Sequence, residues 1–238
     1  MPVFHLEANM KEDSNFSQDL ETPTIAVILG AGHFGQRALS VLAKRPGMRI
    51  YMVDDHKDTL AKVGGTNIKP IHGDAVEFLL SNAAALSHGA HIIPAVPFHL
   101  AYEFAFRVLG TGHRVERIPV PAQLKTSLPH VWQGDHGSLL VSYADFRCPD
   151  DCPEPKFCTV TGQRRDRPLY ELLGCIDMEG YKVSIIRSHQ MGPGVGGYSM
   201  TQLLDMCSLI RSGGPGRWLL GTACKCHGVL SGLEIRDN

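Results

Sequence analysis

Apolar runs alternate with helical patterns of hydrophobic and polar residues along the first half of the chain. The run at 24–30, TIAVILG, is wholly apolar and rich in isoleucine and valine, and glycines and then a helical pattern at 34–45 follow it directly. Further apolar runs lie at 49–55, 67–75, 90–96 and 113–121. Strands that alternate with helical segments of about 10 to 15 residues predict parallel βαβ units with right-handed crossovers.

The alternation continues in the second half, where Ser199 is the expected N-cap of a helix. The patterns of this half are strands at 137–146, 181–190 and 217–223 and helices at 168–176 and 199–212. Residues 119–137 are dense in proline, glycine and polar side chains. This stretch is either a link between two domains or a long loop within one sheet, so one sheet and two sheets remain alternatives.

The composition narrows the classes of function. The 238 residues are 43% hydrophobic and 20% charged, which is enough to form the core of one large domain or two small ones. The formal net charge is −1, so nucleic acid and charged membrane surfaces are not expected as partners. Residues 1–23 form a polar extension without an apolar signal core, and no apolar run is long enough to span a bilayer. We therefore expect a cytoplasmic protein without membrane insertion.

Unusual residues follow the predicted strands. In an open parallel sheet, the loops after the strands emerge at one edge, where ligands bind. The loops in question are GAGHFG at 30–35, the acidic pair at 54–55, RCPDDCPEPKFC at 147–158, HQMGPGVGG at 189–197 and CKCHG at 224–228. We expect all of them at this edge. If the two halves form separate sheets, the last three loops still meet.

The first of these loops matches G-x-G-x-x-G between a strand and a helix. Its glycines permit a tight turn and the close approach of a pyrophosphate to the N-terminus of the helix. Asp54 lies 19 positions after Gly35, near the spacing at which a carboxylate binds a ribose diol. Asp54 would repel a 2′-phosphate, which favours NAD(H) or an adenine nucleotide over NADP(H). The alternative is a turn that needs glycine only for packing. The candidate cofactor-binding residues are Gly30, Gly32, His33, Phe34, Gly35, Asp54 and Asp55.

The N-terminal half resembles a known family. ILGAGHFGQRAL, VDDHKDTLAKV and IHGDAVEFL together look like the TrkA-N (RCK N-terminal) Rossmann domain over residues 24–118. The resemblance implies binding of NAD(H) or other adenine nucleotides and a regulatory role in potassium transport, with Gly30, Gly32, Gly35 and Asp54 at the nucleotide. This chain departs from the family where PAVPFHLAYE replaces the expected polar end of the fourth strand, and its cysteine-bearing half has no counterpart there.

Five of the seven cysteines are candidate metal ligands. Cysteines in a reducing compartment are expected to bind metal or to react as thiols rather than to form disulfides. The candidates are Cys148, Cys152, Cys158, Cys224 and Cys226. Three local sulfurs, with a fourth from Cys224 or Cys226, would complete the shell of a [4Fe–4S] cluster. The same atoms, or His227 in place of one sulfur, would form a zinc site, and a metal-free thiol pair or plain loop is the third alternative.

The two remaining cysteines and several other polar residues have simpler interpretations. Cys175 and Cys207 are expected to be small buried apolar residues. The glycines at 192–197 are a second anion site or a flexible loop, and His189 and His227 are proton carriers, metal ligands or ordinary histidines. Two interpretations are open for Arg164, Arg165 and Arg167: contact with a ligand anion, or a solvated basic turn. The solvated turn is favoured.

Together these patterns predict an α/β fold with a Rossmann-like parallel sheet. Residues 24–120 are the expected dinucleotide-binding domain, and residues 121–238 the expected second α/β portion with a cysteine-rich metal site. The favoured function is an NAD(H)-binding iron–sulfur redox protein, as an oxidoreductase or an electron-transfer component, with a flavoprotein or another redox protein as partner. One alternative is a nucleotide- and redox-sensing regulatory subunit, and another is a zinc-stabilised nucleotide-binding protein. A homo-oligomer is compatible with all three.

Overall fold

The computed structural model describes residues 24–237. The polar extension expected at 1–23 therefore lies outside the described residues. Among the described residues, no helix has the length and apolar character that crossing a membrane requires. The fold is α/β, as the sequence predicts, and its strands form two sheets rather than one.

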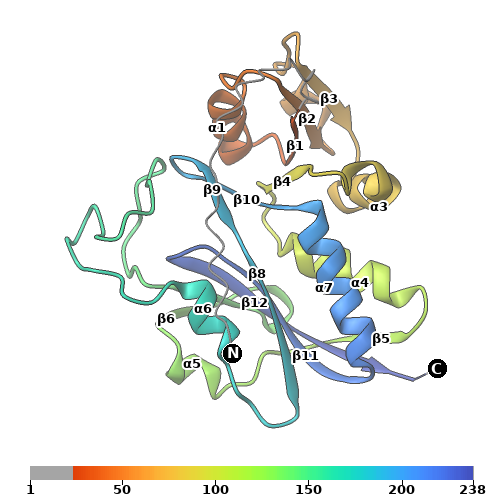
Figure 1. Cartoon of the computed structure of the whole chain (residues 1–238), viewed down its shortest axis with the longest axis vertical. Helices are drawn as coiled ribbons and strands as arrows, with labels where there is room; N and C mark the ends of the chain where they lie inside the picture. Colours follow the sequence, from red (N-terminus) through yellow and green to blue (C-terminus); the bar gives the residue numbers. More distant parts are fainter. Residues whose placement is uncertain (1–23, 238) are drawn as a thin grey trace, which may run out of the picture.

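The first sheet has the strand order β3-β2-β1-β4-β10-β9 and occupies the upper part of Figure 1. Its strands are β1 (Thr24–Leu29), β2 (Met48–Asp54), β3 (Ile68–His72), β4 (His91–Pro94), β9 (His189–Gly192) and β10 (Val195–Ser199). The four strands from the N-terminal half are parallel, as predicted. The other two form an antiparallel hairpin, and β10 pairs antiparallel with β4. The glycine-rich stretch at 192–197 is therefore part of this hairpin rather than a flexible loop.

The second sheet has the order β6-β7-β12-β11-β8, with β5 also paired to β12. Its strands are β5 (Arg114–Ile118), β6 (His130–Gln133), β7 (Leu139–Ser142), β8 (Tyr181–Arg187), β11 (Gly216–Ala223) and β12 (His227–Arg236). Only β8 and β11 are parallel, and the other pairs are antiparallel. The expectation of parallel units throughout the second half was wrong, and β12, which follows the strand expected to be last, was not predicted.

The helices form layers on the faces of the sheets. They are α1 (His33–Leu42), α2 (Lys57–Leu60), α3 (Ala75–Leu86), α4 (Leu100–Gly110), α5 (Leu124–Ser127), α6 (Leu169–Gly174) and α7 (Met200–Gly213), with a 3-10 turn, η1 (Asp135–Gly137). Ser199 caps α7 in a capping box with Gln202, which confirms the expected N-cap. Side chains alternate along β1, so that Ala26 and Ile28 pack on the α1 side and Val27 and Leu29 on the side of α3 and α4.

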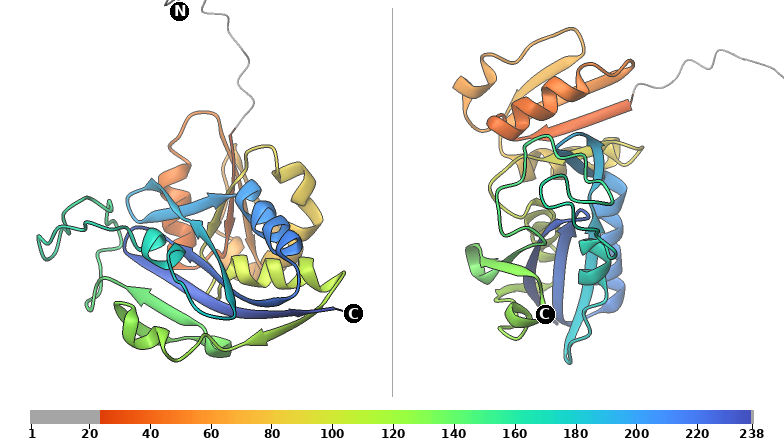
Figure 2. Two further views of the ribbon diagram at one scale, coloured as in Figure 1. Left: turned by 60° about the horizontal axis from the view of Figure 1, so that its bottom comes forward. Right: turned by 90° about the vertical axis from the view of Figure 1, so that its left-hand side faces the viewer.

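One hydrophobic core joins the two sheets. It contains Val27 and Ile92 from the first sheet, Trp218 and Leu233 from the second, and Phe104 from α4, together with residues of α7. Helices α4 and α7 lie side by side in Figures 1 and 2, next to the second sheet. Strands from both sides of the expected domain boundary at residue 120 contribute to each sheet. Strands β9 and β10, from the second half, complete the first sheet, and β5, from the first half, belongs to the second sheet. A domain boundary at residue 120 stays a prediction.

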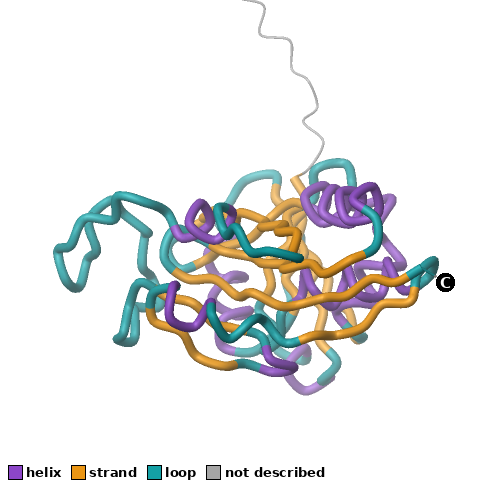
Figure 3. Tube along the Cα trace, turned by 90° about the horizontal axis from the view of Figure 1, so that it is seen from below, coloured by secondary structure: helices purple, strands orange, loops and turns teal. Residues whose placement is uncertain are grey.

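The longest connection lies between β7 and α6, at residues 143–168, and it carries three cysteines. It stands out from the body of the molecule in Figures 2 and 3. Hydrogen bonds attach its base to the β9–β10 hairpin: the Gly194 N–H and the Gln190 side chain both donate to the Cys152 carbonyl, at 3.0 and 2.7 Å. Gly194 has a φ of +70°, and a Cβ there would lie 1.6 Å from the Asp150 carbonyl oxygen. The glycine is therefore needed for this contact.

Candidate functional site

The glycine loop after β1 is held close to the end of β4. Gly30 has a φ of +101°, and a Cβ there would lie 2.5 Å from the Ala95 carbonyl oxygen. A Cβ on Gly35 would lie 1.9 Å from the Gly30 carbonyl oxygen, whereas a Cβ on Gly32 would meet nothing within 4 Å. Two of the three glycines are thus required by packing. The third leaves open space in front of the N-terminus of α1, where no side chain caps the helix.

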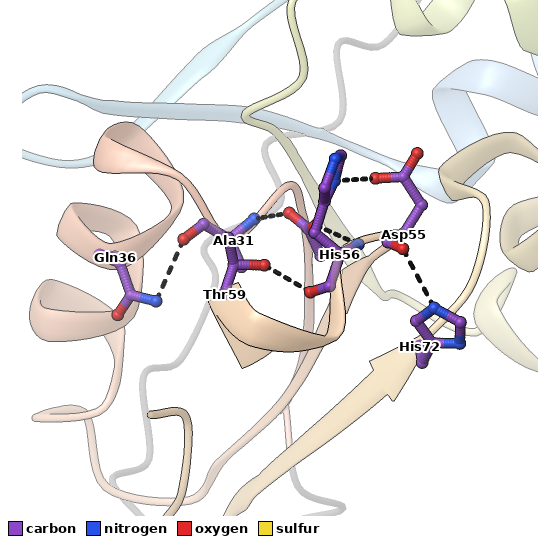
Figure 4. Close-up of polar contacts among 7 residues, drawn as sticks. Ala31, Gln36, Asp55, His56, Thr59 and His72 are labelled. Atoms are coloured by element: carbon purple, nitrogen blue, oxygen red, sulfur yellow. Dashed lines mark hydrogen bonds and ion pairs between the residues drawn. The ribbon is translucent and has the colours of Figure 1, made fainter. Parts of the chain in front are cut away.

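Asp54 at the end of β2 is fixed beside this loop. Its carboxylate accepts hydrogen bonds from the Ala31 N–H at 2.5 Å and from the His56 N–H at 2.8 Å (Figure 4). Burial raises the pKa of the Asp54 carboxyl, but these N–H groups, together with the Thr59 side chain and the His56 ring, outweigh it and hold the pKa below its ordinary value. Asp54, Asp55 and His56 also bring one ligand atom each to within 4.8 Å of one another. The end of β2 is therefore an ordered acidic rim.

A cleft of about 460 Å³ lies between the glycine loop, this acidic rim and the segment after β4. Its lining includes Gly30, Gly32, Asp54, Asp55, Asp74, Ala95 and Phe98. The cleft lies at the carboxyl ends of β1 and β4, between which the strand order reverses, and such a point in an open parallel sheet is a common ligand site. Its volume is within the range of small-molecule sites.

The other two residues of the glycine loop face a different region. The His33 side chain lies 2.8 Å from the Asp150 carboxylate in the loop between β7 and α6, and Phe34 is 58% exposed. Phe34 lines the cavity that contains cysteines rather than the cleft beside Asp54. The loop after β1 therefore belongs to two neighbouring sites at once.

Four of the five candidate cysteines line one cavity of about 560 Å³. They are Cys148, Cys152, Cys224 and Cys226, together with His227 and Glu154. The ends of β7, β8 and β11 bring these loops together, because β12 starts beside the end of β7 and β8 is parallel to β11. The His227 ring lies between two thiols: its Nε2 is 3.4 Å from the Cys148 sulfur and its Nδ1 is 3.9 Å from the Cys224 sulfur.

Two of the cysteine sulfurs accept hydrogen bonds from the N–H groups two and three residues later. Cys224 accepts from the N–H groups of Cys226 and His227 at 3.4 and 3.3 Å. Cys158 accepts from the N–H groups of Val160 and Thr161 and from the Thr161 hydroxyl; these bonds, chiefly those from Thr161, lower the pKa of its thiol to about 7. Such donors stabilise the thiolate, which is the form that binds metals.

Burial raises the pKa of three thiols in this cavity, those of Cys148, Cys224 and Cys226. Burial, with smaller contributions from Glu154, Cys152 and Cys148, raises the pKa of Cys226 to about 12, although Arg165, which donates to the Cys226 sulfur, acts to lower it. Crowded thiols of this kind are deprotonated by a bound cation, so the set of donors fits a metal centre.

The described cysteine and histidine donors are not arranged as a closed tetrahedral site. Within residues 24–237, the cysteine and histidine donors do not form a set of three in which all atoms lie within 4.8 Å of one another. A tetrahedral zinc ion with bonds of about 2.3 Å holds its sulfurs about 3.8 Å apart. A [4Fe–4S] cluster holds its cysteines further apart, because the iron–sulfur core stands between them.

The remaining cysteines occupy different environments. Cys158 is buried and lines a neighbouring cavity of about 340 Å³ together with Arg164, Arg165 and Arg167. It still lies near enough to Cys148 to raise the pKa of the Cys148 thiol. Cys207 is buried in α7, as predicted. Cys175 is exposed, so the prediction that it is buried was wrong. The cause is that α6 ends at Gly174, one residue before it.

A family model described as AF_1314_C, "Uncharacterized protein, C-terminal domain", matches residues 98–236. The chain belongs to the AF_1314_C family. The AF_1314_C region includes α4, the whole second sheet, the β9–β10 hairpin and all five candidate cysteines. A protein of Archaeoglobus fulgidus named "Uncharacterized protein" is 25% identical over 221 residues, which cover 87% of this chain and 98% of that protein. That alignment therefore extends beyond the AF_1314_C region into the first sheet.

Two functional candidates of the AF_1314_C region were missed or undervalued in the sequence. Glu154 has a φ of +48°, and its carboxylate contacts the Cys224 thiol. Arg165 donates to the Cys226 sulfur, although a solvated basic turn was the favoured interpretation. Both contacts depend on how the loop at 143–168 folds back, for which the sequence carries no periodic signal.

Alkylation of the metal-free protein tests the environment of Cys158. Because hydrogen bonds lower its pKa to about 7, its rate of reaction with iodoacetamide should reach half its maximum near pH 7. Thr161→Val removes the hydroxyl donor and should raise that midpoint. Cys207, whose pKa burial raises to about 11, is the internal control, followed in the same digest by mass spectrometry. A common midpoint for both thiols would contradict the assignment.

Proposed function

We propose that this protein binds NAD(H), or another adenine nucleotide, beside Asp54 and holds a metal centre at the cysteine cluster. On this proposal it is a redox protein, as an oxidoreductase or an electron-transfer component. The observation that carries the proposal is the position of the glycine loop. Its Gly30 and Gly32 line the cleft beside Asp54, and its Phe34 lines the cavity of the cysteines.

The first sheet supports the nucleotide half of the proposal. Parallel strands in the order β3-β2-β1-β4, with a glycine turn between β1 and α1, are the arrangement of a Rossmann-type site, and the resemblance to TrkA-N domains agrees with it. The pyrophosphate would lie at the open N-terminus of α1, and the adenine ribose at Asp54. Because Asp54, Asp55 and Asp74 line the cleft, a 2′-phosphate would be repelled, which favours NAD(H) over NADP(H).

The thiols support the metal half. The residues that would hold the metal are Cys148, Cys152, Cys158 and one or both of Cys224 and Cys226, with His227 as a further donor. We favour a [4Fe–4S] cluster, which holds its cysteines further apart than a single ion does, and zinc is the alternative. When bound, such a cluster supplies one-electron redox chemistry. The surrounding chain contributes the N–H groups that stabilise the thiolates and Arg165, which offsets part of their negative charge.

The two cofactors exchange different numbers of electrons. Nicotinamide transfers a hydride, which carries two electrons, and a cluster takes one at a time. A flavin normally connects the two, so we expect a flavoprotein or another redox protein as the partner.

Elemental analysis of protein purified without oxygen tests the metal assignment. About four iron and four sulfide ions per chain with broad visible absorbance are expected. Stoichiometric zinc without colour would support the zinc-stabilised alternative. Protein with neither metal, which also takes up neither on reconstitution, would contradict both.

One contact favours a second candidate function, the nucleotide- and redox-sensing subunit. The contact between His33 and Asp150 joins the start of α1 to the loop that carries Cys148 and Cys152. A change at the metal would therefore be transmitted to the nucleotide loop. For a sensor, we expect the affinity for NADH to differ at least about fivefold between oxidised and reduced protein, and equal affinities would favour the redox protein.

The role of Asp54 is tested by substitution. Asp54→Ala should weaken the binding of NADH at least about tenfold, because a charge-assisted hydrogen bond to the ribose is lost, and metal content should stay unchanged. Asp58→Ala, on the neighbouring helix α2 and outside the lining of the cleft, is the matched control. Calorimetric titration measures both. Equal affinities for the two variants would show that the nucleotide does not bind at Asp54.

A further inference from the structure

A third cavity, of about 470 Å³, lies between the nucleotide cleft and the cysteine cavity. It shares Val96, Pro97 and Phe98 with the cleft, and it shares Leu140 and Val229 with the cysteine cavity. Its walls come from the segment after β4, from η1 and from β12, so both halves of the chain are needed to form it. Neither the nucleotide site nor the metal site uses it.

One wall of this cavity holds a histidine with an unused nitrogen. His99 precedes α4, and its Nδ1 lies 2.9 Å from the hydroxyl oxygen of Ser231, which is itself buried. The imidazole ring stacks on Tyr102, with 15° between the ring planes. Its Nε2 is buried and has no hydrogen-bond partner among residues 24–237. Buried polar atoms are rarely left without a partner, so we expect either an ordered water or a ligand at this nitrogen.

The charges around the cavity exclude anionic ligands. Neither lysine nor arginine lines it, whereas Glu103 and Asp135 do. Glu103 is neutralised by Arg117, with which it forms two hydrogen bonds, and Asp135 forms no ion pair among the described residues. Burial lowers the pKa of His99 to about 3, so its ring is neutral at physiological pH. A phosphate or carboxylate would meet no lysine or arginine among the lining residues, whose basic groups are His99 and His136, so a neutral ligand is favoured.

The apolar part of the lining selects a flat ligand. Phe98, Tyr102, Leu140 and Val229 supply aromatic and aliphatic surface, and His99 and Ser231 are among the polar residues of the lining. Flat aromatic rings pack well against such walls. A polar edge on the ring would then lie against the wall that contains His99, and it would reach the buried nitrogen after a small movement of that wall.

We propose that this cavity binds a planar heteroaromatic ring with an amide or imide edge. Such an edge presents both an N–H donor and a carbonyl acceptor, so it satisfies His99 Nε2 in either tautomer of the imidazole. The inference rests on the proposed function, which supplies two sources of such a ring. One is the nicotinamide of a dinucleotide whose adenosine lies in the cleft, and the other is the ring of a separately bound flavin. In both cases the ring lies one layer of side chains, Leu140 and Val229, from the cysteine cavity.

Three probes distinguish these sources in titrations of the full chain. ADP-ribose tests the cleft alone, NADH adds the nicotinamide ring, and riboflavin presents a neutral flavin ring without phosphate. If the ring is nicotinamide, NADH should bind at least about tenfold more tightly than ADP-ribose. If the ring is a flavin, riboflavin should bind while ADP-ribose occupies the cleft. The proposal would be overturned if riboflavin does not bind, either alone or with ADP-ribose in the cleft, and NADH and ADP-ribose bind with equal affinity.

Substitution of His99 assigns the effect to the cavity. His99→Leu should remove the ring-dependent affinity, about tenfold, and should leave the affinity for ADP-ribose within about twofold. His88→Leu, on the exposed turn after α3, is the matched control. His99→Gln, which keeps a polar edge, should retain part of the affinity, and it provides a second test if the leucine variant does not fold. If His99→Leu and His99→Gln both leave the ring-dependent affinity unchanged, the proposal is overturned.

The same titrations separate this proposal from the nucleotide assignment. Failure of ADP-ribose to bind would contradict the nucleotide site beside Asp54, whatever riboflavin does. If ADP-ribose binds tightly but neither the nicotinamide ring nor riboflavin adds any affinity, the nucleotide site stands and only the proposal for the third cavity is refuted.

Discussion

Replacing Cys148, Cys152 or Cys158 by serine is expected to reduce the metal content of the purified protein to below about one-tenth. A serine hydroxyl is a poor ligand for iron or zinc in a thiolate site. Changing a residue that only contacts a metal ligand reduces metal affinity about 10- to 100-fold, and loss of a ligand itself reduces the affinity more. Cys224→Ser should have the same effect, since its sulfur already accepts two N–H hydrogen bonds. Elemental analysis after identical anaerobic purification measures the result.

Two other cysteines are matched controls for this experiment. Cys175→Ser changes an exposed thiol and Cys207→Ser a buried one, and neither residue lines the cysteine cavity. Both variants should keep the full metal content, and Cys207→Ser should lose only about 1 kcal/mol of folding free energy from local packing. Equal metal content in the Cys148, Cys152, Cys158 and Cys207 variants would refute the metal site.

Gly35→Ala is expected to destabilise the fold by about 3 kcal/mol or more. The added Cβ would lie 1.9 Å from the Gly30 carbonyl oxygen, and that backbone cannot move aside because Gly30 itself lies against the end of β4. The free energy of unfolding in urea measures the loss, provided that unfolding has a single transition. An unchanged midpoint would show that the glycine loop is less closely packed than the structure indicates.

Gly32→Ala separates packing from ligand binding in the same loop. A Cβ at this position meets no atom within 4 Å, and the φ of −69° is ordinary for alanine. The variant should lose about 1 kcal/mol or less of stability, since alanine is a poorer N-cap than glycine. Because the methyl group would fill the space in front of α1, the affinity for NADH should fall at least about tenfold.

The parallel strands of the first sheet were predictable because they are buried on both faces. Residues 26–29 of β1 are fully buried, so their run of apolar side chains is continuous and unambiguous. The glycine turn, the acid after β2 and the N-cap at Ser199 depend on short-range rules and were also found. The meeting of Cys148 and Cys152 with Cys224 and Cys226 was inferred correctly, because it requires only that β7, β8 and β11 end at the same edge. Cys158, which was expected to join them, lines a neighbouring cavity.

The antiparallel elements were missed because glycine was interpreted as a sign of loops. Strand β12 contains Gly228 and Gly232, and a Cβ at Gly232 would lie 2.5 Å from the Ile118 carbonyl oxygen of β5. In the β9–β10 hairpin, a Cβ at Gly197 would lie 2.6 Å from the Ile92 carbonyl oxygen. These glycines allow strands to approach one another closely. That requirement depends on a neighbour far away in the sequence, which local patterns do not contain.

The pairing of β4 with β10 has a consequence for the order of folding during synthesis. Ile92 pairs with Tyr198, which the ribosome adds about 100 residues later. Until then the edge of β4 has no neighbour on that side, and closure of such a long loop is slow because it carries a large entropic penalty. The first sheet is therefore completed only after Tyr198 has been synthesised, long after its four parallel strands.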